Sequence, residues 1–163
     1  GVTIGCGVAV YCPSNPLTRA EMAVLLLRAE HAPGWVPPAP TGAVFSDVPA
    51  DYWAGGHIES LAAEGITLGC GAGKDCPESP VTRAEMAAFL IRARHGAAWT
   101  PPAATGTVFQ DVPASHWASA YIEALAGEGI TQGCGNGSYC PASPVSRAEM
   151  AVFLTRAFDL TLP

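Results

Sequence analysis

The cysteines recur along this chain with a fixed period of 64 residues. One set comprises Cys6, Cys70 and Cys134, and the other comprises Cys12, Cys76 and Cys140. The stretch 65–93, GITLGCGAGKDCPESPVTRAEMAAFLIRA, recurs with few changes at 129–157, and a further copy opens the chain at 1–29. A long, regular period is typical of repeat architectures, in which each unit buries its apolar face against its neighbours.

The repeat is built from two segments. The B segment is the recurring stretch that contains the cysteines, and the A segment covers 45–64 and 109–128. No A segment precedes the first B segment in this sequence, so the order is B, A, B, A, B. We therefore expect a partial unit at 1–33 and whole units at 34–97 and 98–163, the last two opening with a Pro-rich linker.

Each A segment predicts a short amphipathic helix. One helical face carries Ala54, Ile58, Leu61 and Ala62, and the same pattern returns 64 residues later. Asp51 and Ser115 stand where a side chain would cap the start of each helix. Gly65 and Gly129, each followed by an isoleucine, suit the left-handed position that ends a helix.

Each B segment predicts a helix that opens with a capping box, and the chain as a whole is therefore expected to be all-α. The capping residues are Thr18, Thr82 and Ser146, each followed three residues later by a glutamate. Behind each box an apolar stripe predicts a face that packs in the core. The stripes are Met22, Leu25, Leu26 and Ala29; Met86, Phe89, Leu90 and Ala93; and Met150, Phe153, Leu154 and Ala157.

The first B helix lacks a preceding A helix to cover its stripe. We expect an upstream segment to cover Leu25 and Leu26, in preference to a neighbouring subunit, because an exposed apolar face marks a contact site. In either case we expect the isolated chain to self-associate through this face.

The cysteines form three C-x5-C pairs, each within one Gly-rich loop. Local pairs in an even number favour an oxidising, extracellular compartment and the bridges Cys6–Cys12, Cys70–Cys76 and Cys134–Cys140. The alternative is a metal site, but the spacing is longer than the usual zinc spacing and these loops hold no histidine. We expect disulfides and no metal.

Several function classes are disfavoured. The net charge is −6 and Lys74 is the only lysine, so nucleic acid is an unsuitable partner. The longest apolar run, at 22–27, is much too short to cross a bilayer. The four histidines have no nucleophile or carboxylate partner at a motif spacing, and Asp47 and Asp111 suit turn caps better than catalysis. We expect no enzyme and no cofactor.

The order of short motifs resembles the S-layer homology repeat. These motifs are Phe-x-Asp-Val, Trp-Ala, Ile-Glu-x-Leu, Glu-Gly-Ile-Thr, a proline, and (Thr/Ser)-Arg-Ala-Glu-Met-Ala. The resemblance covers nearly the whole chain and implies a pseudo-threefold helical prism at the cell surface. It also implies non-covalent binding of an anionic cell-wall or envelope polysaccharide in grooves between repeats. By the same resemblance, Arg19, Arg83 and Arg147 are expected to contact the sugar, with pairing to a nearby acidic residue as the alternative.

Departures from the family pattern leave two functions open. Cysteine pairs alter the groove loops, and Asp75 stands where Tyr11 and Tyr139 occupy the aromatic position, so the grooves are not expected to be equivalent. Trp35 and Trp99, in the linkers, serve either as sugar-stacking platforms or as pins that hold the linkers to the body. The first function is a polysaccharide-binding anchor. The alternative is a structural module that contacts other proteins in a surface layer, appendage or filament.

Overall fold

The computed structural model describes residues 2–3, 5–31 and 34–160. Within these ranges the chain forms helices joined by long loops, with isolated bridges and no extended strands. The helices are α1 (Arg19–Glu30), α2 (Gly55–Ala63), α3 (Arg83–His95), α4 (Ser119–Gly127) and α5 (Arg147–Ala157). None of these described helices is both long and apolar enough to cross a membrane. The expected all-α class is confirmed.

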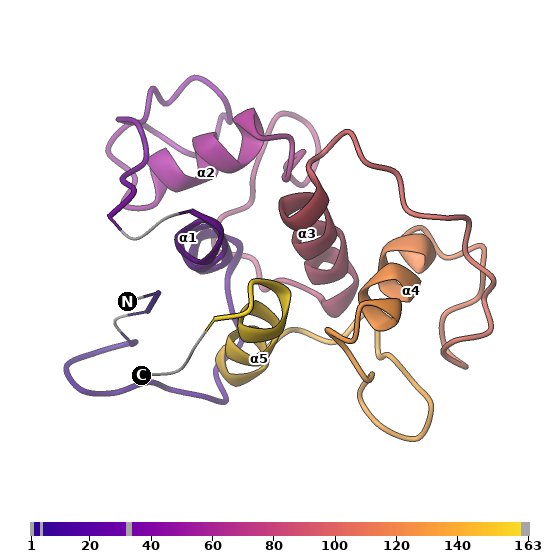
Figure 1. Cartoon of the computed structure of the whole chain (residues 1–163). Coiled ribbons are helices and arrows are strands. Elements are labelled where there is room, and N and C mark those ends of the chain that lie inside the picture. Colours follow the sequence, from indigo (N-terminus) through magenta and orange to yellow (C-terminus); the bar gives the residue numbers. More distant parts are fainter. Residues whose placement is uncertain (1, 4, 32–33, 161–163) are drawn as a thin grey trace.

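Three central helices, each from a B segment, surround the molecular axis. In Figure 1, α1, α3 and α5 lie around the centre, while α2 flanks α1 and α4 flanks α3. The residues just before the central helices bond in a closed ring: Leu17 donates to Val145, Val145 to Val81, and Val81 to Leu17, at 2.8–2.9 Å. This ring gives the chain the expected pseudo-threefold prism.

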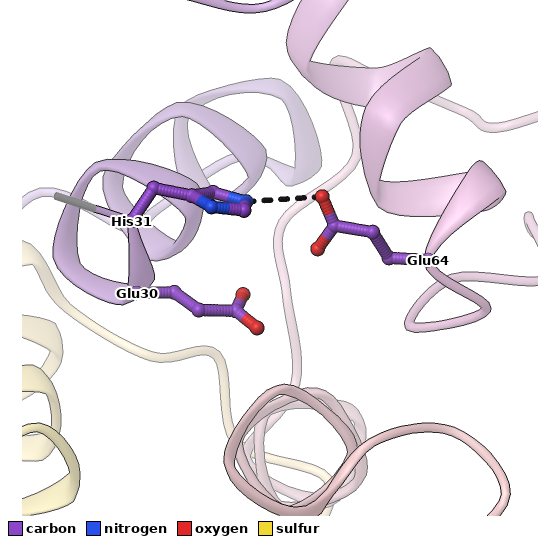
Figure 2. A group of neighbouring side chains, drawn as sticks. All are labelled: Glu30, His31 and Glu64. Atoms are coloured by element: carbon purple, nitrogen blue, oxygen red, sulfur yellow. Dashed lines mark hydrogen bonds and ion pairs between the residues drawn. The ribbon is translucent and has the colours of Figure 1, made fainter. Parts of the chain in front are cut away.

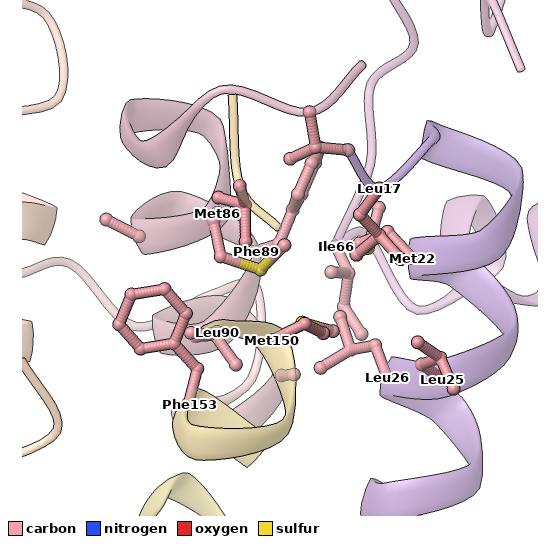
Figure 3. Close-up of a cluster of buried hydrophobic side chains, with 14 of the residues drawn as sticks. Leu17, Met22, Leu25, Leu26, Ile66, Met86, Phe89, Leu90, Met150 and Phe153 are labelled. Carbon is pink, nitrogen blue, oxygen red and sulfur yellow. The ribbon is translucent and has the colours of Figure 1, made fainter. Parts of the chain in front are cut away.

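The core lies where the three central helices meet. Figure 3 shows Leu26 from α1, Leu90 from α3 and Met150 from α5 pointing into one cluster, and all three are buried. Met22 and Met86 are also buried, so the expected packing role of the methionines is confirmed. Burying side chains of this size stabilises a fold by about 1.5–3 kcal/mol each.

The helix ends confirm most of the predicted caps. All three capping boxes are present, and Gly65 adopts a φ of 71°, after which the buried Ile66 donates back to Leu61 at 2.9 Å. The caps predicted for the A helices are wrong. Those helices begin after Ala54 and Ala118, without a side-chain cap, because a turn first occupies 49–55 and its counterpart.

The cover predicted for the first B helix is also wrong. Leu25 is 8% exposed and Leu26 is fully buried, because α1 packs against α2 of the following unit. Each B helix thus pairs with the A helix after it, and α5 is the central helix without such a partner among the described residues. Val152 of α5 is accordingly 46% exposed. Self-association through the α1 face loses its basis, and the unit boundaries at 33/34 and 97/98 stay predictions.

All three expected disulfides are present, Cys6–Cys12, Cys70–Cys76 and Cys134–Cys140. Each closes a short loop, with a sequence separation of 6, that contains a tight turn. The loops therefore depend on the bridges more than the helices do.

Replacing Cys70 and Cys76 together by serine should lower the free energy of unfolding by about 2 kcal/mol, from the larger conformational entropy of the opened loop. Hydrogen exchange should rise first in the loop at 69–76 and leave α3 protected. Chemical denaturation followed by circular dichroism measures the stability change. Loss of helical signal before loop exchange would contradict the prediction.

Candidate functional site

The three arginines singled out from the sequence are the first residues of the central helices, and they are buried. Arg19, Arg83 and Arg147 are 3%, 3% and 4% exposed. Each pairs through Nη1 with the capping-box glutamate of another unit. The pairs are Arg19–Glu85 at 3.2 Å, Arg83–Glu149 at 2.7 Å and Arg147–Glu21 at 2.7 Å. These pairs close a second ring around the axis.

Each glutamate in this ring serves two helices. In Glu149, Oε2 accepts from the Ser146 amide at 2.9 Å, while Oε1 accepts from Arg83. Arg83 also donates through Nε to the Tyr139 carbonyl at 2.7 Å. Helix capping and contact between units are therefore coupled. Contact of these arginines with a ligand stays a prediction, and their structural role is to hold the ring.

Two equivalent grooves lie beside the ring. The α5 groove has a volume of about 310 Å³ and is lined by Arg83, Thr131, Gln132, Gly133, Ala148, Glu149, Val152, Phe153 and Arg156. The α1 groove has a volume of about 230 Å³ and is lined by Thr3, Gly5, Glu21, Val24, Leu25, Arg28, Trp53 and Arg147. Most lining residues of one groove are repeat counterparts of residues in the other.

Each groove combines an apolar wall with excess positive charge. Arg156 in the α5 groove and Arg28 in the α1 groove are exposed, one period times two apart in sequence. Arg156 donates to the Ile130 carbonyl at 3.1 Å, which leaves its other guanidinium donors for a ligand. Together with the ring arginine, these groups outnumber the one glutamate in each groove.

An aromatic residue that the sequence analysis overlooked stands in the α1 groove. Trp53 is 62% exposed there, and its repeat counterpart Trp117 is similarly exposed. The signal was available, because a large exposed apolar side chain repeated before each A helix requires an explanation.

The linker tryptophans pack against the body. Trp35 stacks on His31 with ring centroids 4.2 Å apart, and Trp99 stacks on His95 at 4.3 Å. Both are half-buried against the core, which is the arrangement expected of pins for the linkers. Their use as sugar-stacking platforms stays a prediction.

The position equivalent to these grooves around Arg19 differs in charge. Asp75 replaces the tyrosine, is almost fully buried, and lies with Oδ1 3.3 Å from Nη2 of Arg19. Burial raises the pKa of Asp75, and the Arg19 charge opposes that shift. Arg19 therefore faces two carboxylates, Asp75 and Glu85. Arg92, the counterpart of Arg28, is held by the Ile66 carbonyl at 3.1 Å and the Tyr121 hydroxyl at 3.3 Å.

Asp47 and Asp111 cap the cysteine loops. The two carboxylate oxygens of Asp47 accept from the amides of Asp75 and Cys76, both at 2.8 Å, and Asp111 does the same one unit later. Burial raises the pKa of each aspartate, but these amide bonds outweigh it and hold the pKa below its usual range. The turn-capping role expected from the sequence is what the structure shows.

Two histidines are not isolated surface residues, contrary to the sequence-based expectation. His31 and His95 lie one period apart, and each meets a glutamate that follows an A helix: Nε2 of His31 is 3.0 Å from Glu64, and that of His95 is 2.7 Å from Glu128. The partners are 33 residues apart, which matches no motif spacing. Within the described residues, His31 and Glu64 join Glu30 in a group whose donor atoms could hold a metal ion.

Comparison with known proteins agrees with this geometry. The S-layer homology domain model matches residues 44–87 and 108–151. Over 159 residues, or 91% of this chain, the sequence is 29% identical to cell surface glycoprotein 1 of Acetivibrio thermocellus. It is 35% identical over 123 residues, or 73% of the chain, to a cell surface protein of Thermoanaerobacter kivui. It is 30% identical over 124 residues, or 76% of the chain, to S-layer protein EA1 of Bacillus anthracis.

The helical prism and the repeated motifs define a cell-surface repeat module. The chain belongs to the S-layer homology domain family. It spans 7%, 16% and 14% of the lengths of these three relatives, so it corresponds to a small part of each of them.

Proposed function

We propose that this chain is a non-catalytic anchor that binds an anionic cell-wall or envelope polysaccharide non-covalently in the α1 and α5 grooves. The observation that carries the proposal is the recurrence of one set of side chains in both grooves: a ring arginine, a second exposed arginine, a glutamate and an apolar wall. The surface-layer names of the relatives agree with an anchoring role.

The chemistry of the grooves suits an acidic sugar. The exposed Arg28 and Arg156 present planar guanidinium groups, which can donate two parallel hydrogen bonds to a carboxylate. The start of a helix lies beside each groove and adds a favourable dipole for an anion. Trp53 offers an apolar face to a sugar ring in the α1 groove. Since much of this attraction is electrostatic and exposed, binding should weaken as salt rises.

Replacing both Arg28 and Arg156 by glutamine should reduce retention on purified envelope polysaccharide at least ~10-fold, because each change removes a charged hydrogen-bond donor worth about 1.5–3 kcal/mol. Both side chains are exposed, so the fold should persist. The matched control is Arg92→Gln, at the third equivalent position, where Arg19 is already neutralised by two carboxylates. Retention should be unchanged in that control.

Unchanged retention in the double variant would contradict the assignment of the grooves. Failure of the wild-type chain to bind any envelope polysaccharide would favour the alternative, a structural module that contacts other proteins of a surface layer. A pull-down with purified polysaccharide, repeated at low and high salt, distinguishes these outcomes.

A further inference from the structure

Three side chains converge at the junction of α1 and α2, away from the grooves. Glu30 ends α1, His31 follows it directly, and Glu64 follows α2. Figure 2 shows the three side chains pointing toward one another, with His31 Nε2 3.0 Å from Glu64 Oε1. One donor atom from each lies within 4.8 Å of the others.

One oxygen in this group is unsatisfied. Oε2 of Glu30 is buried and has no hydrogen-bond partner among the described residues. A buried polar atom of this kind costs free energy unless something pairs with it. Burial, followed by the charge of Glu64, raises the pKa of Glu30 to about 7. The site thus brings two acidic groups together beside a buried acceptor that lacks a donor.

The next unit shows what is missing. Its equivalent group contains His95 and Glu128, but Arg94 stands in place of Glu30. Nε of Arg94 lies 2.8 Å from Glu128, so a guanidinium supplies positive charge between the helices. In the first unit the same position carries a second carboxylate, and no cationic side chain replaces the guanidinium in the group.

We propose that Glu30, His31 and Glu64 bind a divalent metal ion of the zinc class, which supplies the positive charge that Arg94 provides in the following unit. One imidazole nitrogen and two carboxylates form a known type of zinc ligand set, and a tetrahedral ion would keep one position for water. Trp35, stacked on His31, fixes the orientation of the imidazole ring. A metal here would join α1 to α2 and strengthen the packing between units.

The test is a calorimetric titration of the whole chain with Zn²⁺, with Glu30→Arg and His31→Ala as variants. We expect one Zn²⁺ per wild-type chain and at least ~10-fold weaker binding in each variant. Glu30→Arg reproduces the arrangement of the second unit, so it should fold normally. Zinc should also raise the melting temperature of the wild type and leave that of Glu30→Arg unchanged, because only a ligand bound to the native state stabilises it.

Three results would overturn the proposal. The first is no measurable Zn²⁺ binding by the wild type. The second is undiminished binding in Glu30→Arg or His31→Ala, which would mean an adventitious ion only. The third is a preference for Ca²⁺ over Zn²⁺, because a calcium ion takes oxygen ligands and does not need the imidazole.

Discussion

Replacing Arg19 by methionine should lower the free energy of unfolding by about 3–5 kcal/mol, because it leaves the buried Asp75 charged and without a cation. Both side chains of this pair are only 4% exposed, so water cannot take the place of the guanidinium. The change also removes the hydrogen bond to Thr67 and the contact of the guanidinium with the Phe89 ring. Chemical denaturation measures the effect.

Arg147→Met is the matched control, since the same ring position there faces Tyr11 in place of an aspartate. Its partner Glu21 is 30% exposed and regains water, so the loss should be smaller, about 1–3 kcal/mol for the hydrogen bonds left unmade. Adding Asp75→Asn to Arg19→Met should recover part of the stability, because the uncompensated charge disappears. Equal losses in the two arginine variants, or no recovery in the double variant, would contradict this account.

The loss in Arg19→Met should also depend on pH. Burial already raises the pKa of Asp75, and removing the cation raises it further. The folded variant then binds its proton more tightly than the unfolded chain does. Its stability relative to wild type should therefore increase as pH falls from the raised folded pKa toward the unfolded value of about 3.9, below which the aspartate is neutral in both states.

Features encoded within a few residues could be predicted from the sequence. The capping box at Thr82 needs only a glutamate three residues away, and the turn at Gly65 needs a backbone that accepts a positive φ. The bridge between Cys70 and Cys76 closes within one loop. The 64-residue period then multiplied each local inference across the chain, which is why the all-α repeat and its core followed.

Features that depend on the order of units around the axis could not be predicted in the same way. The repeat shows that Arg147 and Glu21 exist in equivalent motifs, but their pairing joins residues 126 positions apart. Adjacency in sequence suggested that each A helix covers the B helix after it, whereas α2 covers α1. The ring closure that buries the arginines is a property of all three units together.

The same ring explains how one substitution changes a groove. Tyr139 lies with its ring under Arg83, 4.8 Å from the guanidinium, and satisfies the Arg83 carbonyl through its hydroxyl at 2.8 Å. It leaves the arginine with one carboxylate, Glu149. Asp75 instead adds a second negative charge at Arg19. If the grooves bind an acidic sugar, this residue decides whether the third position can do so.

Replacing Asp75 by tyrosine should therefore raise the number of binding sites per chain from two to three. The change removes the second carboxylate from Arg19 and restores the ring found at the two other positions, so the third groove gains net positive charge. Calorimetry with a short fragment of the envelope polysaccharide counts the sites. Asp75→Asn is the control for charge alone, and it separates the loss of the carboxylate from the gain of the aromatic ring. A folded Asp75→Tyr variant that still binds at two sites would show that the buried charge is not what distinguishes the third position.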